Sequence, residues 1–238
     1  MPHFLLPATA RLTATLFAIS AMSLCQDSGV LLSSRVRSDF ALTADPDSKA
    51  WRRISGVVAA IDPFGKPLPE ARTEIRSRWT TKHLYFIFTS NYQTLYLKQN
   101  PSTTSDTWGL WDYDVVEVFI GHDLNNIQVY KEFEISPQSE FIDLDVDRNR
   151  KGKEVDAQWN SGLTFRTRID KQRKIWFCEM QIPWKSILPH APSPGSELRL
   201  NLYRIEGAPP KRKFVVWQQI DSPSFHTPEK FGRLRLTK

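Results

Sequence analysis

The sequence has little cysteine and lacks the short motifs that mark common enzyme sites. Its two cysteines, Cys25 and Cys178, cannot form a disulfide framework, and neither belongs to a C-x-x-C pair. A zinc site built on cysteine is therefore excluded. No glycine-rich phosphate loop, G-x-S-x-G elbow or H-E-x-x-H pair occurs, so the common catalytic signatures are missing.

The sequence also lacks a long run of one charge. The net charge is +6 and the isoelectric point is about 9.3, yet no five basic residues follow one another. We interpret the basic balance as diffuse solubility charge and expect no nucleic-acid partner. With 40% apolar residues, 10 glycines and 16 prolines in 238 residues, the composition is that of a chain that folds.

The N-terminal segment has the pattern of a leader. An apolar stretch runs from Leu12 to Leu24 and is shorter than the roughly 20 residues that a membrane-spanning helix needs, so no integral membrane span is expected. Ala21-Met22-Ser23 offers small residues for signal peptidase, which predicts a signal peptide over 1–23 and a secreted or periplasmic protein. A lipid anchor on Cys25 is less favoured because Leu24 is bulky, and an apolar, disordered start is the alternative.

After the leader, residues 24–35 are expected to be a flexible segment and residues 36–238 a single domain. The period-2 alternation of strands dominates this domain, and only Pro183 to Leu188 suggests a helical turn. The predicted fold is an all-β antiparallel sandwich of about nine or ten strands. The expected strands cover 74–79, 83–90, 115–120, 129–135, 141–146, 163–169, 174–182, 198–205, 214–218 and 231–236.

Eight tryptophans stand out as candidate ligand contacts, although most of them must belong to the core. Trp108 and Trp111 differ from the rest because they lie in a polar loop, residues 107–114 (TWGLWDYD), that leads into a strand. Aromatic rings in such a loop are expected to face solvent.

Glu117 lies on the strand that follows, on the same face as Val115 and Phe119. A desolvated carboxylate costs several kcal/mol unless it is paired, so Glu117 needs either an internal Arg or Lys or a ligand rich in hydroxyl donors. A sugar has both a flat C–H face for an indole and a rim of hydroxyls for a carboxylate. Both explanations remain open at this stage.

Three motifs, taken in order, resemble the family 9 carbohydrate-binding modules and their bacterial relatives. They are residues 111–120 (WDYDVVEVFI), residues 130–137 (YKEFEISP), and Trp217 followed by residues 225–232 (FHTPEKFG). The resemblance implies an antiparallel β-sandwich that binds a sugar between two tryptophans, Trp111 and Trp217, without catalysis. It assigns hydrogen bonds with the sugar to Glu117, and we add Tyr113 and Asn201 as further candidates.

The sequence departs from that family at two places. Xylan- and cellulose-binding members have an arginine where this chain reads Phe133-Glu134-Ile135, and a polar residue where it reads Phe214-Val215-Val216. The sugar specificity of those members therefore does not carry over, and the expected ligand is a mono-, oligo- or polysaccharide of unspecified type. We expect a monomer that acts in polysaccharide breakdown or uptake.

Other candidates have simpler explanations. The spacing of a calcium loop is mimicked by Asp143, Asp145, Asp147 and Glu154. However, Arg148 occupies the position at which such a loop needs a glycine, so a solvated strand face is the better interpretation. The resemblance nevertheless allows a structural calcium ion, because relatives can carry one. No other cofactor or metal is expected.

Three alternatives to a non-catalytic sugar-binding module remain open. The first is a glycoside hydrolase that uses a carboxylate pair drawn from Asp114, Glu117, Glu132 and Glu134. The second is a haem-binding sandwich with Met180 as an axial ligand. In the third, the sugar site has decayed into a protein-contact surface.

Overall fold

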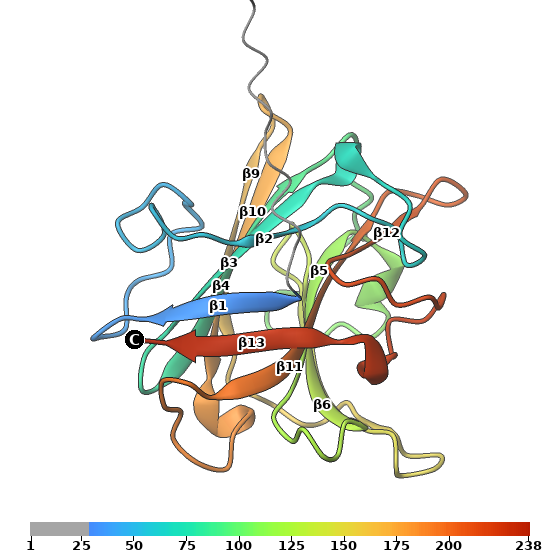
Figure 1. Cartoon of the computed structure of the whole chain (residues 1–238). Helices are drawn as coiled ribbons and strands as arrows, with labels where there is room; N and C mark the ends of the chain where they lie inside the picture. The colour runs from blue at the N-terminus through green and yellow to red at the C-terminus, as the bar shows by residue number, and fades with distance from the viewer. Residues whose placement is uncertain (1–28) are drawn as a thin grey trace, which may run out of the picture.

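One continuous sheet of 13 strands forms the body of the protein in the computed structural model, which describes residues 29–238 (Figure 1). The strands are β1 Val30–Arg35, β2 Val57–Ala59, β3 Thr73–Trp79, β4 His83–Asn91, β5 Val115–Gly121, β6 Val129–Ile135, β7 Phe141–Asp147, β8 Val155–Asp156, β9 Thr164–Asp170, β10 Ile175–Pro183, β11 Glu197–Glu206, β12 Lys213–Val216 and β13 Gly232–Thr237. Their order is β8-β7-β6-β5-β11-β13-β1-β3-β4-β10-β9, with β12 paired to β11 and β2 to β3.

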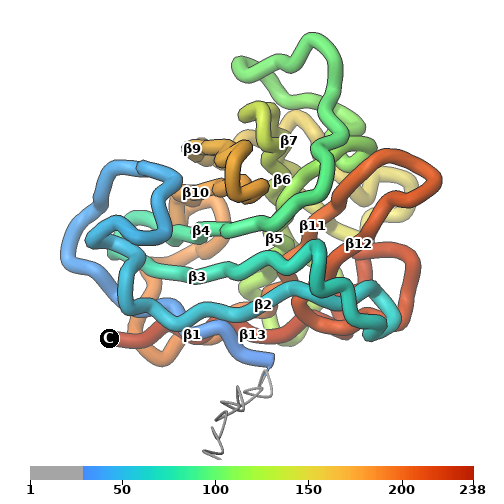
Figure 2. Tube along the Cα trace, turned by 90° about the horizontal axis from the view of Figure 1, so that it is seen from above, coloured from blue at the N-terminus to red at the C-terminus, as the bar shows by residue number. Residues whose placement is uncertain are grey.

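The sheet curls so that its two halves face each other across a hydrophobic core, which makes the fold a β-sandwich (Figure 2). Phe86, Phe88 and Met180 fill this main core from β4 and β10, and Val118 and Leu202 meet them from β5 and β11. The predicted all-β class is confirmed, and the described residues contain no α-helix. Four 3₁₀ turns occur: η1 Pro69–Ala71, η2 Leu110–Asp112, η3 Trp184–Ser186 (within the predicted helical turn) and η4 Pro228–Lys230.

The strand count exceeds the predicted nine or ten because β1, β2 and β8 were not expected. β2 and β8 are too short to show a clear alternation. β1 lies inside the segment 24–35 that was expected to be flexible, and that expectation is wrong for Val30–Arg35. This strand runs parallel to both β13 and β3, whereas all other strand pairs are antiparallel, and it buries Leu31 and Ser33.

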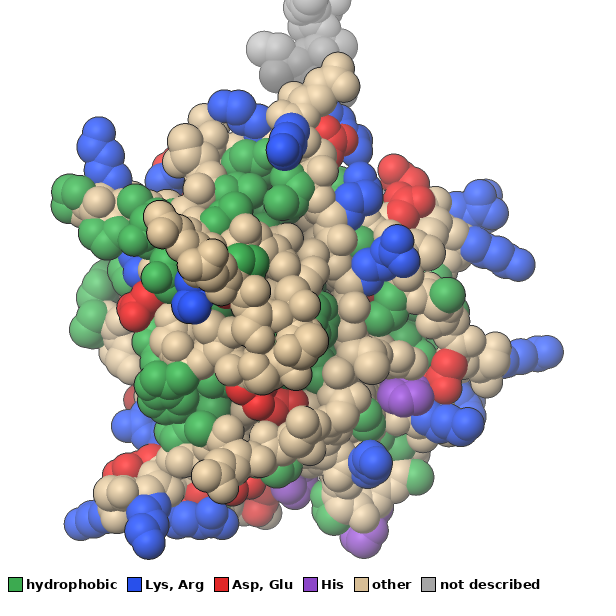
Figure 3. All heavy atoms as spheres, turned by 180° about the vertical axis from the view of Figure 1, so that it is seen from behind, with side chains coloured by type: hydrophobic (Ala, Val, Ile, Leu, Met, Phe, Trp, Pro, Cys, Tyr) green, Lys and Arg blue, Asp and Glu red, His purple; other side chains and the backbone are tan. Residues whose placement is uncertain are grey.

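The predicted leader over 1–23 and the anchor residue Cys25 lie outside the described residues. No helix within 29–238 is long and apolar enough to cross a membrane. Basic side chains are spread around the outline of the face shown in Figure 3 and do not gather into one patch. The diffuse charge expected from the sequence is visible on that face.

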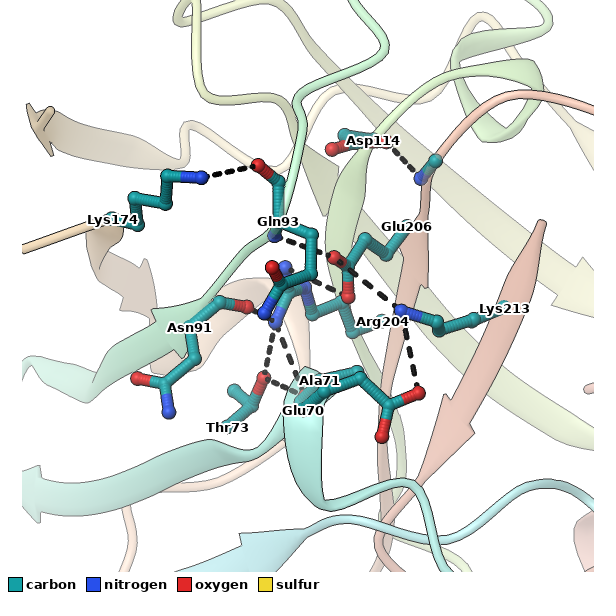
Figure 4. Close-up of polar contacts among 11 residues, drawn as sticks. Glu70, Ala71, Thr73, Asn91, Gln93, Asp114, Lys174, Arg204, Glu206 and Lys213 are labelled. Carbon is teal, nitrogen blue, oxygen red and sulfur yellow. Dashed lines mark hydrogen bonds and ion pairs between the residues drawn. The ribbon is translucent and has the colours of Figure 1, made fainter. Parts of the chain in front are cut away.

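A buried arginine ties β11 to the loop around η1 and to β4 (Figure 4). Arg204 is 0% exposed. Its guanidinium donates hydrogen bonds to the backbone oxygens of Ala71 (3.2 Å) and Asn91 and to the hydroxyl of Thr73 (3.2 Å). It also lies 3.4 Å from the carboxylate of Glu206, which is itself buried. This contact set holds the two halves of the sandwich together at one edge of the core.

Candidate functional site

A cavity of about 310 Å³ lies on the face of β5 and β6 that points away from the main core. Its floor is formed by three glutamates, and its walls are mainly aromatic. The floor residues are Glu117, Glu132 and Glu134, and the wall includes Trp108, Trp111, Phe119, Phe214, Phe225 and His226.

Strand alternation brings the three glutamates together. On β5, Val116 and Val118 point into the main core, so Glu117 points to the opposite face. On β6, Phe133 points into the same core, so Glu132 and Glu134 also face the cavity. The register then places Glu134 directly opposite Glu117, where like charges repel each other.

The glutamates are buried and poorly partnered. Each offers a carboxylate oxygen that lies within 4.8 Å of the other two, and their exposed fractions are only 1–3%. One oxygen of each side chain, Oε1 of Glu117 and Oε2 of Glu132 and Glu134, has no hydrogen-bond partner. Glu132 Oε2 also lies 4.0 Å from Nδ1 of His226. The three carboxyl groups are close enough for one oxygen of each to share a single cation.

Burial is the main cause of the raised pKa values in this cluster. It raises the pKa of Glu132 to about 7 and that of Glu117 well above its ordinary value, to which the charge of Glu132 also contributes. The pKa of Glu134 is also raised, first by burial and then by the charges of Glu117 and Glu132. The cluster thus retains protons that ordinary glutamates would lose near neutral pH.

The positive groups nearest the cluster are occupied elsewhere. The Arg212 guanidinium lowers the pKa of Glu117 in part, but it donates to the backbone oxygens of Trp111 and Tyr113 and forms no ion pair with Glu117 within the described chain. His226 Nδ1 lies 2.7 Å from the Tyr130 hydroxyl, and burial lowers the pKa of this imidazole to about 4. His226 is therefore neutral at pH 7.

The aromatic wall depends on a glycine turn. Gly109 has a φ of +78°, which non-glycine residues rarely adopt, and it lets the chain reverse between Trp108 and the 3₁₀ turn that carries Trp111. The two indole rings lie 5.0 Å apart at 80° to each other. Trp108 is 64% exposed, so a large flat apolar surface faces the opening of the cavity.

Two of the five predicted site residues meet in this cavity, namely Trp111 and Glu117. Tyr113 stacks on Tyr96 at 5.3 Å and is not part of the cavity wall. Asn201 is 0% exposed, and its side chain bonds the hydroxyl of Tyr203 and the backbone of Gln218 and Leu202. The structure thus uses Asn201 to support β11 from within.

Trp217 lies in the main core, 3% exposed, and the structure does not bring it beside Trp111. The reason is the phase of the chain at and just after β12: Phe214 and Val216 face the cavity side, whereas Val215 and Trp217 face the main core. The Trp217 ring packs over Gly232, where an added Cβ would come within 2.9 Å of the ring. We therefore assign the second aromatic wall to Trp108.

Sequence reasoning did not assign Glu132, Glu134 or Phe214 to the sugar-binding site. The alternation of β6 carried the signal for the glutamates, since Phe133 and Ile135 had to face the core and leave their neighbours on the other side. Without the register against β5, however, nothing in the sequence placed these carboxylates beside Glu117.

The candidates for calcium and haem binding lie outside this cavity. On β7, the Asp143 carboxylate accepts hydrogen bonds from the backbone nitrogen and the hydroxyl of Ser161, and Asp145 forms an ion pair with Lys131 at 2.5 Å. Asp147 pairs with Arg150 at 2.8 Å. Met180 is buried in the main core at 0% exposure.

Together, these features define an all-β sandwich that carries an open aromatic cavity over a carboxylate floor. A family model described as carbohydrate family 9 binding domain-like matches residues 50–238, and the chain belongs to this family. The resemblance inferred from the sequence is thereby confirmed.

Two relatives illustrate the range of proteins in which similar sequences occur. An extracellular protein of Arthroderma benhamiae is 25% identical over 184 residues, which cover 72% of this chain and 81% of that protein. The endo-1,4-beta-xylanase A of Thermotoga neapolitana is 24% identical over 191 residues, which cover 79% of this chain and only 16% of the xylanase. The likeness to the xylanase thus involves a small part of that enzyme.

Solved structures share the fold. A protein from Bacteroides uniformis superposes with a TM-score of 0.70 at 15% identity, covering 87% of this chain and 98% of that chain. A carbohydrate-binding module of family 9 from Caldicellulosiruptor kristjanssonii superposes with a TM-score of 0.59 at 13% identity, covering 87% of this chain and 95% of that chain.

Proposed function

We propose that the chain binds carbohydrate, without catalysis, in the cavity between Trp108, Trp111 and the three floor glutamates. The observation that carries this proposal is the pair of indole rings, Trp108 exposed and Trp111 partly buried, beside buried glutamates that each have an unpartnered oxygen. A sugar ring would cover an indole with its C–H face and donate its hydroxyls to the carboxylate oxygens. Family membership supports the same conclusion, as do the glucose and cellotriose complexes of the Caldicellulosiruptor module.

The convergence of the three glutamates also bears on the hydrolase alternative. A glycosidase needs two carboxyl groups that flank the scissile bond, one acting as acid and the other as nucleophile or base. Here all three side chains rise from neighbouring strands of one sheet face, so a sugar would lie above them and not between them. We therefore expect no hydrolysis when the purified protein is assayed on a polysaccharide panel.

We further propose that the protein is a secreted or periplasmic monomer that helps polysaccharide breakdown or uptake. The leader pattern in the first 23 residues supports export, and the name of the Arthroderma relative refers to an extracellular protein. Mass analysis of the protein recovered from an expressing host tests the cleavage expected before Leu24. An intact N-terminus on exported protein would contradict this cleavage.

Truncating either indole of the cavity should remove most of the sugar affinity. A glycan array first identifies the ligand that binds best, and calorimetry then measures its dissociation constant. We expect Trp111→Ala and Trp108→Ala each to weaken binding by about 10- to 100-fold, because an aromatic contact at the centre of a site contributes about 1–3 kcal/mol.

Trp217→Phe is the matched control for these two variants. Its ring lies in the main core, so we expect lower stability but an unchanged dissociation constant at a temperature where the variant is folded. Loss of affinity in Trp217→Phe together with full affinity in Trp111→Ala would show that the sugar site is not this cavity.

A further inference from the structure

The cavity floor gathers three carboxyl groups that form no close ion pair with a cation of the described residues. Three carboxylates meet within 4.8 Å, and the charge of Asp112 also acts on Glu134. Arg212 is the nearby cation that acts on Glu117, while His226 is neutral at pH 7 because burial lowers its pKa to about 4. A cation that enters the cavity would stabilise the ionised form of these groups in place of their protons, which a neutral ligand cannot do.

The unpartnered oxygens form a site for a donor that comes from outside the protein. Glu117 Oε1, Glu132 Oε2 and Glu134 Oε2 belong to side chains that are at least nine-tenths buried and that line the cavity. Each such atom is costly when it lacks a hydrogen bond, and a charged donor offsets more of that cost than a hydroxyl does. A primary ammonium group has three N–H donors and one positive charge, which matches three oxygens in one cluster.

The walls favour an organic cation over a metal ion. Ca²⁺ requires six to eight oxygen ligands and Mg²⁺ keeps several water molecules, whereas the groups above this floor are the rings of Trp108, Trp111, Phe214 and Phe225. Aromatic faces attract an ammonium group by about 0.5–2 kcal/mol, depending on how far it is desolvated. They also cover the apolar face of a sugar ring that carries this group.

We propose that the cavity selects a carbohydrate with a primary ammonium group, that is, a free amino sugar or the deacetylated units of an amino-sugar polymer. This proposal rests on the proposed function, since it names the class of sugar that enters the same cavity. The ammonium group lies on the carboxylates of Glu117, Glu132 and Glu134. The ring lies against Trp108 and Trp111.

The test compares three sugars that differ only at C2: glucosamine with an ammonium group, N-acetylglucosamine with an amide and glucose with a hydroxyl. Calorimetry on the full chain at pH 7 should show glucosamine binding at least about tenfold tighter than the other two, which corresponds to about 1.4 kcal/mol. Addition of EDTA should leave this preference unchanged. An oligomer of glucosamine serves as a second probe of the same preference.

Glu117→Gln should remove the preference, so that the variant binds glucosamine and glucose with similar affinities, because it lacks one of the carboxylates that pair with the ammonium group. Glu197→Gln, which removes a partly buried carboxylate on β11 outside the cavity, is the matched control and should keep the preference. Thermal denaturation shows whether each variant is folded, and Glu134→Gln repeats the test on the neighbouring strand.

The outcomes separate this inference from the proposed function. If glucose and glucosamine bind equally well, the amino-sugar inference is wrong and carbohydrate binding stands. If no sugar or glycan binds, both fail. If EDTA abolishes glucosamine binding, or if Ca²⁺ alone binds with an affinity that Glu117→Gln removes, the cluster is a metal site and the inference is overturned.

Discussion

Replacing Arg204 by methionine is expected to lower the free energy of unfolding by about 3–5 kcal/mol, because the buried carboxylates of Glu206 and Asp114 would lose the charge of Arg204 and only Glu206 would keep another cation, Lys213 at 3.9 Å. Glu206 lies 3.4 Å from the guanidinium, and the charge of Arg204 also holds down the pKa of Asp114, which burial raises to about 6. The same substitution removes the hydrogen bonds that the guanidinium donates to the backbone oxygens of Ala71 and Asn91. Urea denaturation monitored by tryptophan fluorescence measures the loss.

Arg235→Met is the matched control for Arg204→Met. Arg235 pairs with Glu197 at 2.6 Å, but its side chain is 50% exposed, so its removal should cost less than about 1 kcal/mol. The double variant Arg204→Met with Glu206→Gln should recover part of the stability, because one buried charge disappears. Equal losses for Arg204→Met and Arg235→Met would show that the buried network does not stabilise the fold as described.

Raising the pH from 6.5 to 8 is expected to destabilise the protein, and Glu134→Gln is expected to flatten this dependence. Burial raises the pKa of Glu132 from its ordinary value of 4.5 to about 7, and it raises those of Glu117 and Glu134 as well. The folded state therefore holds protons that the unfolded state releases. This stabilisation is fully present below pH 4.5 and is lost as the pH rises through the folded-state values.

The size of the effect follows from the number of protons retained. Each retained proton makes the free energy of unfolding fall by about 1.4 kcal/mol per pH unit, and the shift of Glu132 alone is worth on the order of 3 kcal/mol. Chemical denaturation at pH 6.5, 7, 7.5 and 8 should show a total fall of at least about 2 kcal/mol. Glu134→Gln should show a shallower slope and should exceed the native protein in stability at pH 8.

Two other groups contribute little over this pH range. The pKa of His226 is lowered from 6.5 to about 4, so this imidazole favours the fold increasingly as the pH rises to about 7.5, and its contribution above pH 6.5 is less than about 0.5 kcal/mol. The thiol of Cys178, whose pKa burial raises from 9.0, acts mainly above pH 8. Glu197→Gln should retain the native slope. A flat native profile, or one that Glu134→Gln leaves unchanged, would contradict the protonated state of the cluster.

Much of the fold could be predicted because alternation is a local signal. The hairpin of β3 and β4 and the central position of β4 follow from runs such as residues 83–90, whose faces are both apolar, and the structure confirms both. The short strands β2 and β8 escaped detection because they contain too few residues to alternate. β1 escaped because its partners, β13 and β3, are distant in the sequence.

The site was predicted only in part. Trp111 and Glu117 were found because each is unusual in its own local context, one in a polar loop and the other in an apolar strand. Trp217 was assigned to the wall from its position in a motif, but its phase at the end of β12 turns it toward the main core. Asn201 was added as a further hydrogen-bonding candidate, and its side chain forms its hydrogen bonds within the protein.

The sequence by itself determined the all-β class, the positions of the long strands along the chain and the family, because these depend on the periodicity and spacing of side chains along the chain. Only the tertiary structure decided that Glu117, Glu134 and Glu132 share one cavity floor and that Trp108 stands beside Trp111. The register between β5 and β6 brings the glutamates together, and it is a relation between two segments that neither strand determines alone. Gly109 permits the left-handed turn, but the distance between the two indole rings depends on how the whole loop packs.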